Sequence, residues 1–430
     1  MLLPDWLEPL EPLIRELAER SLPAYSALSE EEQYVSPTFV EANYSEPIEA
    51  PKDESGLVEV GKPAKDLRFE AFLDGVQRTI LWRRIPLPTG ALVPIHIAHI
   101  SAGLLLRNGD GCLLMEPELT AARLLLLGPF EGLRRAGVEL EELSRASQAI
   151  ILDIDTRTFA FPNTINEWVL CDTTFRGTED GRENQTEGAL LGDALFNEGL
   201  VRSRAQGRVA TLRQRLEFAV LARFRKTYPE KWVLVDGPLF FIDKWRRRAE
   251  RILGDELGEN DNTLVEDKLL RNAVGLIKTQ RLRPKNPEQV IKIGPTQRSL
   301  VMRLLREVDI KGRHDVPDEE GGYGGLHLTW YTRLRSRNSP PYGLLGLIRL
   351  DIHRATLPGV VRGDALNQDS FESYRPLIDA ITWAIWRERW PAFRRTDDYR
   401  SVAEPYPIQQ VERVLKAMAL PRRFLAYFSS

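Results

Sequence analysis

Apolar positions along the chain form short runs that predict strands, and these runs alternate with stretches of helical periodicity. Runs of strand length occur at residues 69–73, 80–85, 93–107, 149–155, 233–235, 272–279, 327–335 and 344–351. Apolar residues at helical spacing predict helices over 7–17, 119–127, 140–146, 205–227, 245–257, 296–308, 374–389 and 407–418. Because three strands open the body and strands then alternate with helices, the pattern predicts an α/β fold with a mixed central sheet.

The first 65 residues have a different pattern from the rest. Residues 7–17 carry an apolar stripe that predicts an amphipathic helix, which packs either on its own domain or on a partner. Residues 29–65 are rich in Glu, Pro and Ser and show little periodicity, as expected of an extended arm. We therefore divide the chain into an N-terminal helix and arm, residues 1–65, and a body, residues 66–430.

Composition narrows the class of protein. The chain has 430 residues, of which 43% are hydrophobic and 28% charged, as in globular proteins. No apolar run has membrane-spanning length, and Cys112 and Cys171 have no close partner in sequence. We therefore expect a cytoplasmic protein without membrane contact. The net charge of −3 gives no general attraction to nucleic acid, so DNA binding would need a local basic patch.

Two predicted strands each lead into an aspartate followed by glycine. Residues 233–235 precede Asp236, and residues 69–73 precede Asp74. Asp-Gly is a common turn dipeptide, so each aspartate alone could simply cap a turn. Two carboxylates at the ends of two strands would, however, suit a divalent cation, which prefers oxygen ligands. We therefore expect a turn after each strand and a metal site made from both aspartates.

Glu217 and Lys278 are further candidates for this site. Glu217 lies in the predicted helix 205–227, which leads after a short loop into the Asp236 strand, so the two carboxylates could meet. An ion pair with Arg213, four residues earlier, is the alternative. Lys278 follows an apolar strand, from which it could extend into solvent or hold a phosphate as a point charge.

Aromatic and basic residues near these elements suggest contact with DNA. Tyr331 and Arg333 share a predicted strand, where a ring can stack on a base and a guanidinium can bind phosphate, although core packing is as common. Arg213 and Arg281 lie close in sequence to Glu217 and Lys278. The basic residues of this region predict a phosphate-binding track. They are Arg213, Arg215, Arg223, Arg225 and Lys226 on the predicted helix, residues 246–248, and Lys278, Arg281, Arg283 and Lys285.

Other kinds of site have less support. Asp153 and Asp155 alternate on the predicted strand 149–155, where they could bind a cation, but neither a glycine turn nor a basic track is near them. The five histidines lack zinc-site spacing. The chain has no Walker loop, no dinucleotide fingerprint and no nucleophile elbow, which argues against NTPases, dinucleotide enzymes and α/β-hydrolases.

Taken in order, the motifs resemble those of the NurA family of nucleases from about Phe69 to the C-terminus. The matching segments are FLDGVQR, RLEFAVLARF, WVLVDGPL, NAVGLIKT, WYTRL and LLGLIRLDI. The resemblance implies a ribonuclease H-like mixed central sheet flanked by helices, with an insertion around residues 108–205. It also implies that Asp74, Glu217 and Asp236 are metal ligands, and that Lys278 and Tyr331 lie near the phosphate.

The family also has a closing motif, Tyr-Pro followed by Ala-His, whose histidine completes the metal site. This chain keeps Tyr406-Pro407, but no histidine follows His353. Glu404 or Glu412 could replace it, because carboxylates serve Mg²⁺ and Mn²⁺ well.

The resemblance implies a DNA nuclease dependent on Mn²⁺ or Mg²⁺, acting in DNA end resection and double-strand break repair. It further implies a homodimer docked on a HerA-like hexameric ATPase. Both 5′–3′ exonuclease and single-strand endonuclease activity stay open. A catalytically reduced scaffold that binds DNA or the motor is the alternative, since the histidine is missing. A guide-strand binding protein would need a 5′-phosphate pocket, of which the sequence gives no sign.

Overall fold

A computed structural model gives the structure of the chain. It describes residues 11–23, 40–51, 54–64, 66–153, 155–163, 167–175, 189–239, 252–254, 267–278, 282–283, 286–307, 327–335, 344–360, 368–389 and 404–419.

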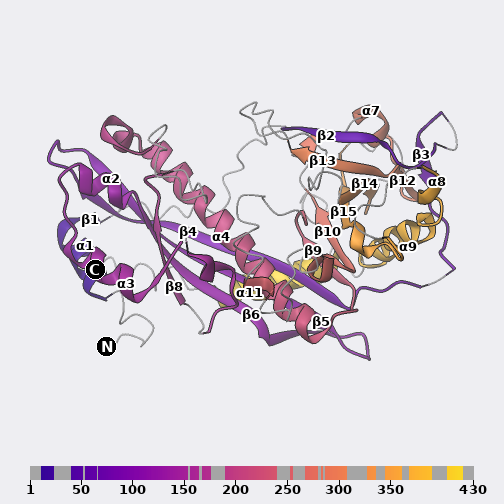
Figure 1. Ribbon diagram of the computed structural model, residues 1–430, viewed down its shortest axis with the longest axis horizontal. Coiled ribbons are helices and arrows are strands. Elements are labelled where there is room, and N and C mark those ends of the chain that lie inside the picture. Colours follow the sequence, from indigo (N-terminus) through magenta and orange to yellow (C-terminus); the bar gives the residue numbers. More distant parts are fainter. Residues whose placement is uncertain are drawn as a thin grey trace.

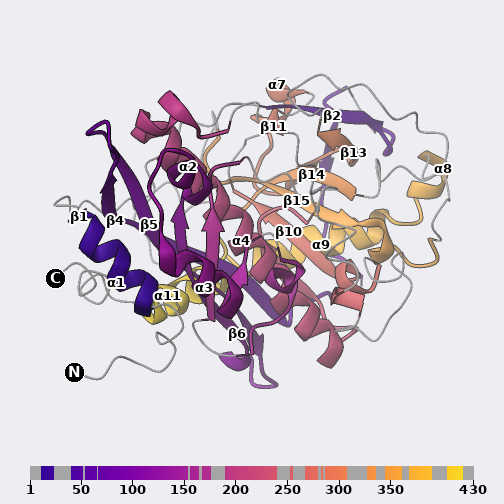
Figure 2. The same ribbon diagram turned by 60° about the vertical axis from the view of Figure 1, so that its left-hand side comes forward.

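One large mixed sheet runs through the molecule, and helices lie against it (Figure 1 and Figure 2). The strands are β1 (Leu22–Pro23), β2 (Val40–Pro47), β3 (Leu57–Glu59), β4 (Ala71–Pro86), β5 (Leu92–Arg107), β6 (Leu113–Gly128), β7 (Ile151–Leu152), β8 (Glu167–Asp172), β9 (Val233–Asp236), β10 (Ala273–Ile277), β11 (Leu282–Arg283), β12 (Gln297–Ser299), β13 (Met302–Glu307), β14 (His327–Arg333) and β15 (Leu347–His353). Their main order is β11-β2-β13-β14-β15-β10-β9-β4-β5-β6-β8-β7, with β1, β3 and β12 attached beside it. The α/β class with a mixed central sheet is therefore confirmed.

The helices differ widely in length. They are α1 (Glu11–Arg20), α2 (Phe130–Arg135), α3 (Glu141–Ala149), α4 (Glu198–Thr227), α7 (Pro287–Val290), α8 (Gln368–Phe371), α9 (Arg375–Arg387) and α11 (Tyr406–Met418), with the 3₁₀ helices η2 (Thr156–Phe159), η3 (Gly192–Phe196) and η4 (Arg354–Thr356). Within the described residues, no helix is long and apolar enough to cross a membrane.

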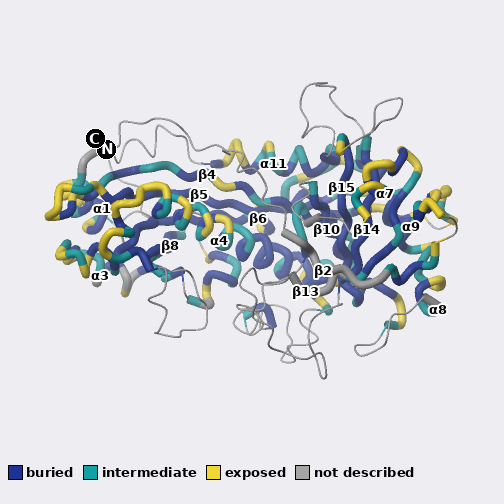
Figure 3. The backbone as a smooth tube through the Cα atoms, turned by 90° about the horizontal axis from the view of Figure 1, so that it is seen from above, coloured by how far each residue is buried: buried dark blue, intermediate teal, exposed yellow. Residues whose placement is uncertain are grey.

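Alternate residues of the central strands pack against different helices. On β4, Leu73 belongs to the core cluster that contains the apolar face of α4, whereas Phe72 belongs to the cluster that contains α9 and α11. On β9, Val235 and Leu234 divide in the same way. Since side chains alternate along a strand, α4 covers one face of the central sheet and α9 with α11 the other. Figure 3 shows buried positions along these strands and exposed ones on the outer helices and turns.

The N-terminal helix packs on its own chain. Leu13, Ile14 and Leu17 are buried in a core cluster with residues of β4, β5 and β6. The sequence left open whether this helix packs on its own domain or on a partner. The described part of the helix packs on its own domain. Residues 1–10, which contain the first part of the predicted stripe, lie outside the described residues.

Parts of the predicted arm belong to the sheet. β2 pairs with β13 and β11, and β3 pairs with β12. The buried carboxylate of Glu49 accepts hydrogen bonds from both terminal nitrogens of Arg298, at 2.5 and 2.8 Å. The arm is therefore connected to the body by strand pairing and by a buried ion pair.

Two predicted helices are wrong. Residues 119–127 are part of β6, and residues 296–308 contain β12 and β13. β6 is paired on both sides and its second half is buried throughout, so an apolar run there has no polar face to reveal a period of two. The predicted strand 149–155 is reduced to Ile151 and Leu152, and most of the predicted helix 245–257 lies outside the described residues.

The predicted turn at Asp74-Gly75 is also wrong. β4 continues from Ala71 to Pro86, and Asp74 and Gly75 pair with Gly103 and Ala102 of β5. Two of the three strands expected at the start of the body, residues 69–73 and 80–85, fall in the single strand β4, and the third is β5. β6, which pairs with β5, is the third long strand of this part of the sheet. Asp74 therefore lies within a strand, held by ladder pairing, and not at its end.

Candidate functional site

The candidate site lies in the middle of the sheet, where β9 ends. β9 runs parallel to β4 on one side and to β10 on the other. After Asp236 the chain turns away at Gly237, whose φ of 110° favours glycine and whose N–H donates to the carbonyl of Leu276 at 2.8 Å. β4 continues beyond this point, so in the described residues no strand pairs with its β9 side beside Gly75. Polar side chains can gather at this open edge.

Asp74, Asp236 and Lys278 share the face covered by α11. Each stands two residues along its strand from a member of the core cluster that contains α11: Phe72, Leu234 and Leu276. The ammonium of Lys278 lies 2.9 Å from a carboxylate oxygen of Asp236. It also contacts Glu404, which lies just before α11. Lys278 therefore bridges two carboxylates from different parts of the chain.

Glu217 reaches the same edge from the other face. Neighbouring residues of a strand project to opposite sides, so Gly75 faces α4 where Asp74 faces α11. A Cβ on Gly75 would collide with the Glu217 carboxylate. Arg213 pairs with Glu217 and donates to the carbonyl of Gly75 at 3.2 Å. Of the two sequence readings, the ion pair with Arg213 is present, and the carboxylates of Asp236 and Glu217 also act on each other's surroundings through their charges.

Burial and mutual repulsion dominate the electrostatics of the site. Burial raises the pKa of Asp74 well above its ordinary value, and the carboxylates of Asp236, Glu217 and Glu412 raise it further, while Lys278 lowers it. Burial likewise raises the pKa of Glu217 to about 7, against the lowering effect of Arg213. Burial and the neighbouring carboxylates therefore favour the protonated forms of Asp74 and Glu217, while Lys278 and Arg213 oppose this effect.

Lys278 supplies the positive charge that faces the carboxylates of Asp236 and Glu404. Burial alone would lower the pKa of its ammonium, but Asp236, Glu404 and Asp74 outweigh that effect and raise the pKa above its usual value. Burial also raises the pKa of Glu404, which Lys278 lowers in turn. Lys278 is therefore a permanent cation, and Glu404 is a member of the site that the sequence offered only as a substitute ligand.

The chemistry of these side chains suits a hard divalent cation, although their arrangement is not closed around one. The oxygen donors come from Asp74, Asp236, Glu217 and Glu404, and oxygen is the ligand that Mn²⁺ and Mg²⁺ prefer. Among the described residues, no three acidic, histidine or cysteine side chains stand together as a group that could hold a metal ion. Glu412, the other proposed substitute, pairs with Lys416 at 2.8 Å and acts on Asp74 only through its charge.

Tyr331 and Arg333 are not part of this site, which corrects the prediction from sequence. Tyr331 is fully buried in a small cluster with Met302, Leu347 and their neighbours. Arg333 is fully buried as well, and its guanidinium donates to the carbonyls of Ile293, at 2.6 Å, and Ile291, at 3.2 Å. Both residues hold the β14 region together and cannot meet DNA without unfolding it.

The predicted basic track survives only in part. Arg213 is partly exposed beside the carboxylates, and Arg281 lies outside the described residues. Arg215 and Arg225, on the same helix as Arg213, are buried and donate to main-chain carbonyls. Arg215 and Arg225 are therefore not available to phosphate, because their guanidinium groups donate hydrogen bonds to buried main-chain carbonyls.

The competing aspartates have structural roles. Asp153 is buried and lies 2.9 Å from Arg208, while Asp155 caps η2 and pairs with Arg157. The strand that would have placed both on one face ends at Leu152. These contacts leave Asp74 and Asp236 as the stronger candidates.

Comparison with known proteins adds no identity. No protein-family model matches the chain, and no curated protein matches its sequence.

Proposed function

We propose that the chain is a divalent-metal-dependent deoxyribonuclease that uses the carboxylates at the end of β9. One observation carries the proposal: Asp74, Asp236 and Glu404 surround Lys278 on the α11 face, and Glu217 approaches the same edge from the α4 face. A group of buried acids whose pKa values are raised by one another is stabilised by an added cation. The resemblance to NurA nucleases supports the same reading.

The position of each residue suggests its role in binding the metal ion or the phosphate. Asp74 and Asp236 would hold Mn²⁺ or Mg²⁺, with Glu217 and Glu404 as further oxygen donors. When bound, such an ion polarises a phosphodiester and lowers the pKa of water. Lys278 stays protonated and can donate to a phosphate oxygen of the strand. Arg213, partly exposed next to Glu217, can bind a neighbouring phosphate through its guanidinium.

Cleavage of labelled single-stranded and double-stranded DNA in Mn²⁺ tests the proposal. Asp74→Asn and Asp236→Asn keep the side-chain shape and remove the charge, and each should slow cleavage by at least about 10²-fold, because even outer partners of metal ligands cost 10- to 100-fold. Asp193→Asn, at an exposed position on η3, is the matched control and should cleave like the wild type. Undiminished cleavage by the Asp74 and Asp236 variants would place the active site elsewhere.

A second candidate is a scaffold that binds DNA or a motor without cutting. The observation that favours it is Lys278, which already pairs with Asp236 and Glu404 and so supplies a built-in cation. Calorimetric titration with Mn²⁺ separates the two candidates. Binding in the micromolar to millimolar range that Asp74→Asn abolishes supports the nuclease, and its absence supports the scaffold.

The proposed setting is DNA end resection and double-strand break repair, in a homodimer docked on a HerA-like hexameric ATPase. Its support is the resemblance in motif order from FLDGVQR to LLGLIRLDI. Light scattering of the chain, alone and mixed with a co-encoded ATPase, measures both associations. A monomeric mass and no co-elution with the ATPase would remove this part of the proposal and leave the cleavage assay unaffected.

A further inference from the structure

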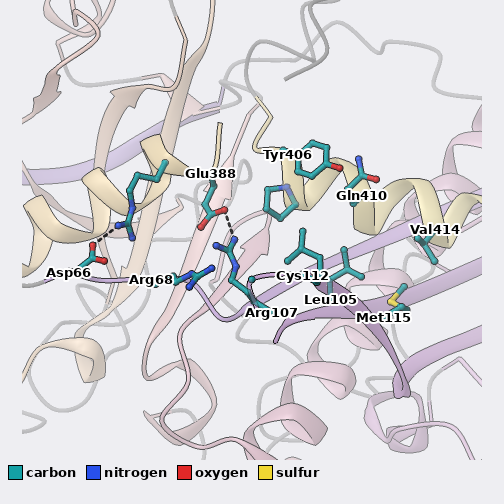
Figure 4. Close-up of a pocket in the computed structure, with 14 residues that line it drawn as sticks. Asp66, Arg68, Leu105, Arg107, Cys112, Met115, Glu388, Tyr406, Gln410 and Val414 are labelled. Carbon is teal, nitrogen blue, oxygen red and sulfur yellow. Dashed lines mark hydrogen bonds and ion pairs between the residues drawn. The ribbon is translucent and has the colours of Figure 1, made fainter. Parts of the chain in front are cut away.

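A pocket of about 760 Å³ lies along α11, and none of the carboxylates at the end of β9 lines it (Figure 4). Tyr406, Gln410 and Val414 line it at intervals of four residues, so one stripe of α11 forms its wall. Glu412 does not belong to that stripe. Its charge acts on Asp74 and raises the pKa of that carboxyl. The volume falls in the range of about 300–1,000 Å³ that is usual for small-molecule sites.

One end of the pocket is cationic. Arg68, Arg107 and Arg387 line it together with two carboxylates, Asp66 and Glu388. Arg107 is committed to Glu388 at 2.6 Å, and Arg387 to Asp66 at 2.5 Å. The charges within each pair cancel, so the positive charge of Arg68 is in excess.

Arg68 is the group available to a ligand. Its side chain is exposed, and within the described residues it makes no hydrogen bond or ion pair. Gly111 lies directly against it: a Cβ there would stand 3.0 Å from a terminal nitrogen of Arg68. In Figure 4 its guanidinium lies at the same end of the pocket as Arg107 and Glu388. A guanidinium in this position fits a phosphate, to which it can donate two parallel hydrogen bonds.

The other end of the pocket is apolar. Leu105, Leu113, Met115 and Val414 line it, and Figure 4 shows Leu105, Met115 and Val414 at the end away from Asp66. The ring of Tyr406 offers a stacking face, and the amide of Gln410 offers both a donor and an acceptor. A simple anion would leave this part of the volume unfilled. An anion joined to a flat, hydrogen-bonding ring would fill it.

We propose that this pocket binds a nucleotide, with its phosphate on Arg68 and its base between Tyr406 and the apolar wall. The nucleotide is either free or the 5′-phosphorylated end of a DNA strand. Binding needs none of the carboxylates at the end of β9, so this site stands whether or not those carboxylates cleave DNA.

Cys112 provides a direct readout of occupancy. It lines the pocket and is exposed, whereas the only other cysteine, Cys171, is fully buried. Iodoacetamide should therefore modify Cys112 selectively in the folded full-length chain. Deoxythymidine 5′-monophosphate should slow this alkylation several-fold, since a bound ligand covers the thiol, while inorganic phosphate and deoxythymidine alone should protect far less.

The decisive variant is Arg68→Ala, whose exposed position leaves folding intact. It should raise the nucleotide concentration needed for protection on the order of tenfold or more, because a charge-assisted contact is lost. The matched control is Arg145→Ala, which removes an exposed arginine paired with Glu142 on α3 and should leave protection unchanged. Absence of protection by every nucleotide probe, or equal protection in Arg68→Ala, would overturn the proposal.

Oligonucleotides distinguish the two sources of the ligand. Protection by a 5′-phosphorylated strand but not by its 5′-hydroxyl counterpart assigns the pocket to a strand end, and protection by the mononucleotide alone assigns it to a free nucleotide. Repeating the assay in Asp74→Asn separates this site from the proposed nuclease. Loss of cleavage with retained protection is the expected result there, and loss of protection would contradict the independence of the two sites.

Discussion

Gly75 shows how an absent side chain shapes the candidate site. The Glu217 carboxylate occupies the space that a Cβ would take, so glycine lets an α4 acid approach the β4 backbone. We expect Gly75→Ala to destabilise the protein by about 1–3 kcal/mol, because overpacking displaces buried groups. Urea unfolding monitored by tryptophan fluorescence measures this.

Gly207 is the matched control for that substitution. It lies within α4, and among the described residues no atom outside the adjoining turns of that helix lies within 4 Å of an added Cβ. Gly207→Ala should therefore stabilise the protein by about 0.5–1 kcal/mol, since alanine loses less backbone entropy in a helix. Equal effects of the two substitutions would show that Glu217 does not fill the space at Gly75.

His96 predicts a pH dependence of stability. Burial lowers its pKa from 6.5 to about 4, with smaller contributions from Arg202 and Arg84, and its buried Nδ1 has no hydrogen-bond partner in the described residues. The folded state thus binds this proton less well than the unfolded state. The contribution to stability that depends on neutral His96 is fully present above pH 6.5. It is lost as the pH falls towards 4, at a cost of roughly 3 kcal/mol. Unfolding of His96→Leu between pH 4 and 7 should show a shallower loss than the wild type, and parallel curves would exclude His96 as the cause.

At the scale of elements, the buried ion pair between Glu49 and Arg298 fixes the arm to the body. Arg298 also binds Asp379 of α9 at 2.8 Å, and Glu49 also forms an ion pair with Arg375 at 3.1 Å. Arg298→Met should cost about 3–5 kcal/mol, because it leaves buried carboxylates short of a partner. Denaturant unfolding gives the value, and Glu49→Leu combined with Arg298→Met should recover much of it. Arg15→Met, which breaks the exposed pair with Glu11, should change stability by less than about 1 kcal/mol.

Buried strands rich in β-branched residues, such as β5 and β15, could be predicted from sequence, whereas the leucine- and alanine-rich β6 could not. α9 and α11 lie close to their expected limits because each has one apolar stripe, whereas α4 begins at Glu198 and not at residue 205. The second half of β6 predicts a helix because leucine and alanine favour helices and because this buried run has no polar face to show a period of two. β12 and β13 lie in residues 296–308, which also predict a helix. The carboxylate group was expected from Asp74, Glu217 and Asp236, but the face on which each lies depends on strand pairing, which no local pattern encodes.

At the scale of the whole molecule, the clusters share their strands. β4 contributes Leu73 to the core beneath α4, Phe72 to the core beneath α11 and Trp82 to the core beneath α1. Unfolding of any one of these three clusters would disturb β4, on which the other two depend. We therefore expect one cooperative thermal transition. Differential scanning calorimetry tests this by comparing the calorimetric and van't Hoff enthalpies. Two resolved transitions would show that the arm and the body are independent units.

Synthesis on the ribosome gives the site at the end of β9 a further property. β9 lies between β4, translated long before it, and β10, translated after it, and Glu404 emerges only near the end of the chain. Such non-local pairing forms late, since the intervening chain must be ordered first. A nascent chain that has reached only β9 therefore holds Asp74 and Asp236 without Lys278, and one that has reached Lys278 still lacks Glu404. A product that ends before residue 404 lacks one carboxylate of the candidate site, and if these acids cleave DNA we expect it to cleave more slowly than the full chain.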